Sequence, residues 1–153
     1  MTELRDVMRR FPHGVAVLTI DADGERLGLT VGSLVSLSLD PPLVGVAVSR
    51  QSAMHELLHR AGDFAVSLLA SGQDGLAQHF ARGVPPIAMW NGVEVVEDEG
   101  APLLAGALGW LRCRLVDEVA DGDHTLFVGE VLAADLGGAA PPLLHLESGY
   151  RSA

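Results

Sequence analysis

A short helical segment carries the most recognisable catalytic pattern in the chain, H-E-x-x-H at residues 55–59. In this pattern two histidines on one helical face bind zinc, and the glutamate between them activates a water molecule. The predicted helix ends at Gly62, and no third ligand follows at a spacing that zinc proteases use. We therefore interpret His55, Glu56 and His59 as the solvated face of a helix and expect no metal site.

No other segment presents a nucleophile or an acid–base pair. The chain contains no lysine, which excludes Schiff-base chemistry and the phosphate-binding lysine of a P-loop. It contains no serine nucleophile elbow, no G-x-G-x-x-G after a strand and no paired carboxylates in an apolar run. Cys113, the single cysteine, lies in a predicted strand on the face opposite Arg112 and Arg114, so we interpret it as a core thiol. We expect no catalytic side chain.

Three segments are better suited to binding a ligand. Residues 49–52 (Ser-Arg-Gln-Ser) enter a helix, where backbone N–H groups, hydroxyls and a guanidinium suit a phosphate. The alternative is an ordinary serine N-cap beside an exposed arginine. Residues 28–33 place glycines and hydroxyls inside a strand, which indicates either a closely bound ligand or a bend in a barrel. His124 follows a tight turn, from which it projects over the mouth of a barrel or lies at the surface.

These residues need a scaffold, and the hydrophobic pattern predicts one built mainly of strands. Turns rather than helical crossovers join the strands, so we expect an antiparallel sheet that curls into a barrel. Thr2 and Ser52 are the expected N-caps of the first two helices. Strands are predicted at 15–20, 26–36, 43–48, 64–69, 107–120, 125–135 and 143–146, helices at 3–11, 53–60 and 74–82, and a long loop at 83–102.

Composition limits the partners and the compartment. The length favours a single domain, 1–153, and 48% apolar residues exclude a disordered chain. A formal charge of −10 argues against nucleic acid and anionic lipid. No apolar run reaches the roughly 18 residues of a membrane helix, and the charged start is no signal peptide. The single cysteine cannot form an internal disulfide, so we expect a protein of the reducing cytoplasm. A mean hydropathy of +0.30 fits either an oligomer interface or a genome rich in Ala, Leu and Val.

Ordered segments along most of the chain resemble a known family. The most specific are Ser-Leu-Ser-Leu-Asp-Pro-Pro at 36–42 and Gly-Asp-His-Thr at 122–125, and the others lie at 10–15, 28–34, 62–69, 110–113 and 142–150. Together they resemble the flavin reductase-like family, the short-chain NAD(P)H:flavin oxidoreductases. The resemblance implies a mainly β fold, an antiparallel split β-barrel of Greek-key type with a few short helices, and a homodimer.

The resemblance also implies which residues bind the cofactor. Residues lining the flavin ring would be Thr30, Val31, Gly32, Ser33, Ser36 and Leu37, and those at the flavin phosphate would be Ala47, Val48, Ser49, Arg50 and Ser52. Phe80 would contact the distal part of the flavin, and His124 with Tyr150 would meet the nicotinamide nucleotide. Three positions depart from the family pattern: His13 stands where a small hydroxyl residue is usual, Gly32 where a larger residue is common, and Met54 where threonine is frequent.

The function that these features imply is an NAD(P)H-dependent flavin reductase. It would pass hydride from NADH or NADPH to FMN or FAD and supply reduced flavin to a partner monooxygenase. Hydride transfer between cofactors needs no protein nucleophile, so the missing catalytic constellation is consistent with it. Backbone N–H groups near residues 30–33 would stabilise the charge that develops on the reduced ring. The alternative is a non-catalytic split barrel that carries or senses flavin or haem.

Overall fold

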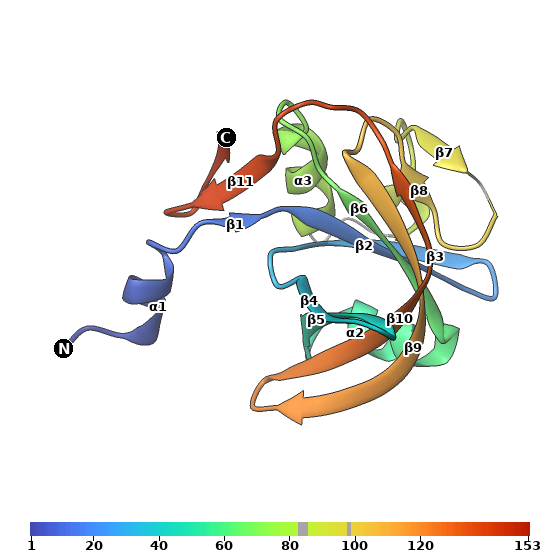
Figure 1. Ribbon diagram of the computed structural model, residues 1–153, viewed down its shortest axis with the longest axis horizontal. Coiled ribbons are helices and arrows are strands. Elements are labelled where there is room, and N and C mark those ends of the chain that lie inside the picture. Colours follow the sequence, from blue (N-terminus) through green and yellow to red (C-terminus); the bar gives the residue numbers. More distant parts are fainter. Residues whose placement is uncertain (83–85, 98) are drawn as a thin grey trace.

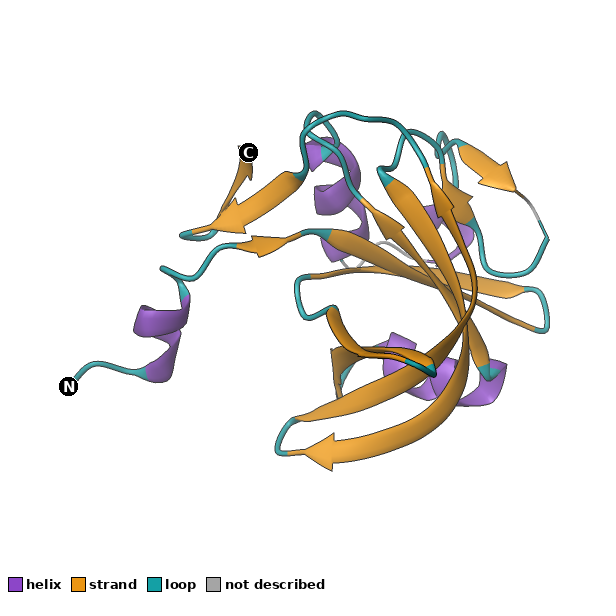
Figure 2. Cartoon of the chain, viewed as in Figure 1, coloured by secondary structure: helices purple, strands orange, loops and turns teal. Residues whose placement is uncertain are grey.

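The computed structural model describes residues 1–82, 86–97 and 99–153, and strands predominate in it (Figures 1 and 2). The helices are α1 (Leu4–Met8), α2 (Ala53–Ala61), α3 (Asp74–Ala81) and α4 (Pro86–Met89). The strands are β1 (His13–Gly14), β2 (Ala16–Ala22), β3 (Glu25–Val31), β4 (Val35–Leu39), β5 (Pro42–Ser49), β6 (Asp63–Leu68), β7 (Val95–Glu97), β8 (Leu103–Leu104), β9 (Gly109–Asp121), β10 (His124–Leu136), β11 (Leu143–Leu146) and β12 (Gly149–Ser152).

One strongly curled antiparallel sheet organises the molecule. Its seven strands follow the order β3-β2-β6-β9-β10-β5-β4, so that β3 and β4 are its edges. The long strands β9 and β10 lie at the middle of this order (Figure 1). They join the half made of β3, β2 and β6 to the half made of β5 and β4. Figure 2 shows them as the long strands of the body. Register shifts between Val128 and Gly129, and between Val131 and Ala133, interrupt their ladder. Such bulges increase local bending and twist, which helps the sheet to curl.

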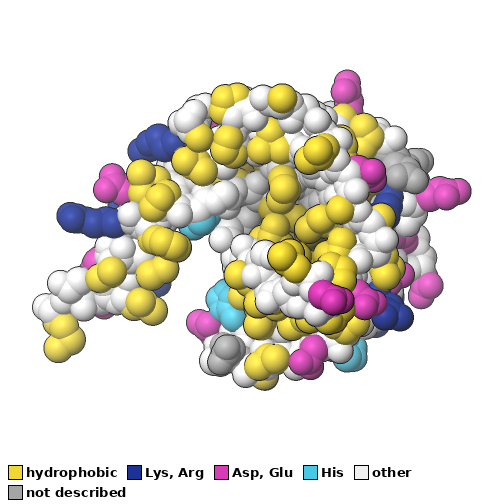
Figure 3. Space-filling model, viewed as in Figure 1, with side chains coloured by type: hydrophobic (Ala, Val, Ile, Leu, Met, Phe, Trp, Pro, Cys, Tyr) yellow, Lys and Arg dark blue, Asp and Glu magenta, His cyan; other side chains and the backbone are white. Residues whose placement is uncertain are grey.

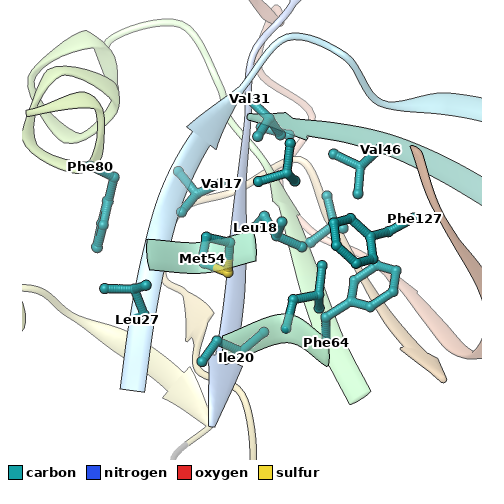
Figure 4. Packing of buried hydrophobic residues seen from close by; sticks show 14 of the residues in the cluster. Val17, Leu18, Ile20, Leu27, Val31, Val46, Met54, Phe64, Phe80 and Phe127 are labelled. Atoms are coloured by element: carbon teal, nitrogen blue, oxygen red, sulfur yellow. The ribbon is translucent and has the colours of Figure 1, made fainter. Parts of the chain in front are cut away.

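The core fills the inside of this curl. Its largest fully buried side chains include Phe64, Phe127 and Leu18, with Met54 entering from α2 (Figure 4). At Gly129 an added Cβ would lie 2.7 Å from Cε1 of Phe64 and 3.0 Å from Cβ of Cys113. The glycine therefore gives the Phe64 ring the space it occupies on the inner face of β10.

The second helix forms as its sequence predicts. Ser52 is the N-cap, and its Oγ accepts a hydrogen bond from the Met54 N–H at 3.1 Å. Gly62 ends the helix with a φ of 75°, in the left-handed region that favours glycine. Met54, Leu57 and Leu58 are buried against the sheet. This packing fixes the start of α2 beside the end of β5.

Three predictions about the elements are wrong. The strand predicted at 26–36 ends at Val31, and a new strand, β4, begins at Val35 and pairs with β5. The described part of the loop predicted at 83–102 contains α4 and the β7–β8 pair; residues 83–85 and 98 lie outside the description. The N-cap of α1 is Glu3 rather than Thr2, because Glu3 and Asp6 form a capping box.

The first helix is shorter than the predicted 3–11 and stands away from the rest of the chain (Figure 1). Its apolar stripe of Leu4, Val7, Met8 and the following Phe11 is 49–77% exposed. The amphipathic pattern is therefore present, but no described element of this chain covers its apolar face. No described helix is long and apolar enough to cross a membrane.

Candidate functional site

A groove of about 490 Å³ lies between the N-terminal arm and the curled sheet. Figure 3 shows the molecule hollowed between the arm and the body. The volume is within the range of about 300–1,000 Å³ that is typical of sites for small molecules and cofactors. The lining residues come from α1, β1 and the segments after them, the ends of β3 and β5, and the starts of α2 and β10: Met8, Phe11, His13, Leu29, Thr30, Val31, Gly32, Ser33, Ala47, Val48, Ser49, Ser52 and His124.

The β3 wall of the groove is held by two side-chain hydroxyls. Ser33 Oγ donates to the Ala47 carbonyl at 2.9 Å and accepts from the Ala47 N–H at 3.0 Å. Thr30 Oγ1 donates to the Ala77 carbonyl of α3 at 2.6 Å. Both hydroxyls are thus engaged with the backbone. The backbone N–H groups of Gly32 and Ser33 make no hydrogen bond within the described part of the chain, so the wall offers main-chain donors to a ligand.

The other end of the groove is a corner rich in hydrogen-bond donors. Ser52 Oγ accepts from the Met54 N–H, and Ser49 Oγ accepts from the Gln51 N–H at 3.3 Å. Each serine keeps its own hydroxyl hydrogen for a ligand. The start of α2 adds the positive end of the helix dipole, which favours an anion. This arrangement suits a phosphate group.

His124 faces this corner from the neighbouring strand. It lies directly opposite Ser49 in the β5–β10 ladder. Its Nδ1 is 2.7 Å from Oδ1 of Asp123, and because an ionised carboxylate only accepts hydrogen bonds, Nδ1 donates. The hydrogen bond and charge of His124 lower the pKa of the Asp123 carboxyl. Nε2 of the imidazole is left for a ligand in the groove.

A second cavity of about 210 Å³ adjoins the groove and is shaped by stacked rings. His13 and His145 stack with ring centroids 5.1 Å apart and planes inclined by 25°, and Tyr150 meets His145 edge-on at 5.3 Å. Burial, together with the positive charges of His13 and Arg151, lowers the pKa of His145. Burial and the nearby Asp74 raise the pKa of Tyr150. Both groups are therefore biased toward their neutral forms.

The structure brings most of the sequence-predicted site residues together. Those that line the groove are Thr30, Val31, Gly32, Ser33, Ala47, Val48, Ser49, Ser52 and His124. Tyr150 lines the adjoining cavity. Sequence reasoning did not include Met8, Phe11, His13, Leu29 and His145 in the site. The places of Met8, Phe11, His13 and His145 depend on how the arm and the β11–β12 hairpin fold back, whereas Leu29 is the neighbour of Thr30 in β3 and was not considered as a site residue.

Four predicted site residues line neither the groove nor the adjoining cavity. Phe80 is 1% exposed and packs against Trp90 with ring centroids 5.2 Å apart, so its side chain belongs to the core. Ser36 and Leu37 are exposed on the edge strand β4. Arg50 donates its Nη1 hydrogen to the Gly122 carbonyl at 3.1 Å, which directs it toward the β9–β10 turn.

The histidines of the H-E-x-x-H pattern have separate hydrogen-bond partners. Nε2 of His55 is 2.7 Å from Oγ1 of Thr125, and Nδ1 of His59 is 2.6 Å from Oε2 of Glu118. Among the residues that the structure describes, no three His, Cys, Asp or Glu side chains are grouped to hold a metal ion. Cys113 is 1% exposed, and burial raises the pKa of its thiol to about 12, which confirms a core thiol.

The fold and the groove define a small antiparallel β protein with room for a phosphorylated ligand. Comparison with known proteins identifies the family. The sequence profile described as a flavin reductase like domain matches residues 8–153, and the chain belongs to this family. The resemblance seen in the sequence is thereby confirmed.

Individual relatives agree with this membership. An NADH-dependent FAD reductase of Streptomyces globisporus is 43% identical over 136 residues, covering 86% of this chain and 74% of the relative. The reductase component of 4-hydroxyphenylacetate 3-monooxygenase from Thermus thermophilus is 40% identical over 147 residues, covering 96% of this chain and 93% of the relative. The solved structure of NADH:FAD oxidoreductase SgcE6 from Streptomyces globisporus superposes with a TM-score of 0.92 at 40% identity, covering 97% of this chain and 90% of that one.

Proposed function

We propose that this protein is an NAD(P)H-dependent flavin reductase that transfers hydride to FMN or FAD and supplies reduced flavin to a partner monooxygenase. The observation that carries the proposal is the groove, which joins a wall of main-chain donors to a phosphate-suited corner. Relatives named as reductase components of monooxygenases and as NADH:FMN and NADH-dependent FAD reductases support the same activity.

The residues of the groove fit a flavin nucleotide. In this proposal the ring lies along residues 30–33, and the phosphate is bound by the hydroxyls of Ser49 and Ser52 at the start of α2. His124 orients the nicotinamide nucleotide through Nε2, with Tyr150 beside it. When bound, the flavin supplies the hydride-accepting chemistry. The protein binds and orients both nucleotides, and the N–H groups of Gly32 and Ser33 would stabilise negative charge on the ring.

We further propose that the curled sheet is the split barrel of this family and that residues 1–153 form one domain in the cytoplasm. The support is the curl itself, its two free edges at β3 and β4, and the high superposition with a family member over 97% of the chain. These finer assignments go beyond the antiparallel sheet and the short helices described above.

The active form in this proposal is a homodimer. The apolar stripe of α1 and the edge-strand side chains Val35, Leu37 and Leu39 are exposed, and surfaces of this kind are usually covered by a partner. Charge favours a second copy of the chain as that partner. Residues 1–14 and 143–153 carry four of the ten arginines but only three of the twenty acidic residues, whereas the rest is strongly acidic. The basic arm of one protomer complements the acidic body of another.

Steady-state rates for each pair of nicotinamide nucleotide and flavin test the activity. Purified protein with catalytic FMN or FAD and excess NADH or NADPH should consume the nicotinamide nucleotide, which is followed by its near-ultraviolet absorbance. Flavin binding without turnover with any pair would contradict the proposal and favour the carrier or sensor.

His124→Ala tests the proposed contact with the nicotinamide nucleotide. We expect the KM for this nucleotide to rise about tenfold, the loss of one charge-assisted hydrogen bond, while flavin affinity stays within about twofold. His59→Ala is the control, because His59 bonds to Glu118 outside the groove. Equal kinetics in wild type and His124→Ala would remove His124 from the site.

A further inference from the structure

One polar side chain of the groove, His13 of β1, lies beside the β3 wall and has a ring nitrogen that is free to meet a ligand. The hydroxyls of Thr30 and Ser33 are both bound to backbone carbonyls. His13 lines the same groove, and it also lines three smaller cavities beside it. Its imidazole is therefore placed at the point where these spaces meet.

The position of the His13 ring depends on the absence of a side chain at Gly32. A Cβ added to Gly32 would collide with Cε1 and Nδ1 of His13 and lie 2.9 Å from its Nε2. The imidazole thus occupies the space that the side chain of residue 32 would otherwise fill. His13 and Gly32 therefore form a single structural feature.

The neighbouring groups hold the ring in one orientation. Nδ1 of His13 is 3.1 Å from the Gly14 carbonyl oxygen, and because a carbonyl only accepts hydrogen bonds, Nδ1 donates. His145 stacks on the ring, and Tyr150 supports His145 from its edge. Nε2 has no hydrogen-bond partner among the described residues. It can accept a hydrogen bond when the ring is neutral and donate one when the ring is protonated.

We propose that His13 is a ligand-binding residue that recognises the polar, carbonyl- and N–H-bearing edge of the flavin ring, in place of a side chain at residue 32. This inference rests on the proposed function. Because the phosphate-suited corner is built from β5 and α2, a flavin anchored there and lying along β3 extends its ring toward the arm that carries His13. An oriented imidazole nitrogen is matched by the alternating donors and acceptors of that edge.

Riboflavin, which has the flavin ring but no phosphate, separates ring recognition from phosphate recognition. His13→Phe keeps a flat ring for stacking on His145 but removes both nitrogens. We expect the affinities of this variant for riboflavin and for FMN to fall by the same factor of about ten. Quenching of flavin fluorescence measures both affinities. Ser52→Ala should lower the affinity for FMN but not for riboflavin, and His59→Phe should leave both affinities unchanged.

A rescue experiment guards against misfolding of the single variants. His13→Ser alone should lose affinity for riboflavin, and the double variant His13→Ser with Gly32→Thr should regain most of it, because a polar group returns to the same space. Circular dichroism and thermal unfolding confirm that each variant is folded. Recovery in the double variant would be unexpected if His13 only stabilised the arm.

The outcomes distinguish this inference from the proposed function. Riboflavin affinity within about twofold of wild type in His13→Phe would overturn the role of His13 while leaving flavin reduction intact. Weaker binding of FMN but not of riboflavin would indicate that His13 contacts the phosphate, and would also overturn its proposed role at the flavin ring. If the wild-type protein bound neither flavin, the proposed function itself would fail.

Discussion

At the scale of single residues, hydroxyl groups in the groove have two different uses. Ser33 and Thr30 tie the end of β3 to β5 and to α3, whereas Ser49 and Ser52 keep a donor hydrogen for a ligand. The Ser33 hydroxyl both donates and accepts hydrogen bonds within the fold, and the Thr30 hydroxyl donates one, so both stabilise the wall of the groove. Their contribution to binding is indirect, through the shape of the wall.

Ser33→Ala tests this structural use. Removing the hydroxyl leaves the Ala47 N–H and carbonyl without their partner, which we expect to lower the free energy of unfolding by about 1–3 kcal/mol. Urea unfolding followed by circular dichroism measures the change. Ser36→Ala, at an exposed position of β4, is the matched control and should change stability by less than about 0.5 kcal/mol.

Cys113 allows a prediction about pH. Burial raises the pKa of its thiol from 9.0 to about 12, so the folded state binds more protons than the unfolded state between these values. Stability from this group is complete below pH 9 and falls as the pH rises toward 12. Cys113→Ala should reduce the alkaline slope of the unfolding free energy. At neutral pH the native thiol should react with a thiol reagent only after unfolding, and rapid labelling of folded protein would contradict its burial.

At the scale of elements, two glycines make room for aromatic rings where a strand ends and where a strand pair changes register. Gly32 lies at the end of β3, where the chain leaves the sheet before β4, and Gly129 lies at a register shift of β10. At both positions a side chain would collide with a neighbouring ring, of His13 and Phe64 respectively. The absence of a Cβ is thus a packing requirement, in addition to any gain in backbone freedom.

Gly129→Ala tests the packing requirement on β10. The new methyl group would meet the Phe64 ring and Cys113, and overpacking of this kind costs about 1–3 kcal/mol. Thermal unfolding should show a lower Tm. Gly138→Ala is the control, because nothing lies within 4 Å of a Cβ at that position. Equal stability of both variants would show that Phe64 and its neighbours can shift to accommodate the added methyl group without a loss of stability.

At the scale of the whole molecule, the chain leaves apolar surface that its own elements do not cover. The N-terminal arm projects from the body, and its apolar side chains are visible on the surface (Figure 3). The edge strand β4 adds Leu39, which is 89% exposed. In the proposed dimer both features are buried by the second protomer.

The double variant Leu37→Lys with Leu39→Lys tests the dimer. Two charges on the edge strand would oppose burial, so the protein should sediment as a monomer in analytical ultracentrifugation while its circular dichroism stays native. Ile87→Lys, a change at a 92% exposed position of α4, should leave the association state of the wild type unchanged. A wild-type protein that sediments as a monomer at all concentrations would refute the homodimer.

Most of the local elements and the family could be predicted from the sequence alone. The Ser52 cap, the Gly62 stop and the turns depend on contacts within a few residues, so they can be predicted from short segments. Ordered motifs placed most of the groove-lining residues on the right strands. Alternation along β9 was sufficient to predict a buried Cys113.

The contacts that these residues make could not be predicted from the sequence. The bond from Thr30 to Ala77 spans 47 residues, and His13 stacks on His145 from the opposite end of the chain. The burial of Phe80 and the exposure of α1 likewise depend on which distant elements pack there. Local patterns cannot specify such contacts, because the energy of each one depends on a partner whose position is set by the folding of the whole sheet.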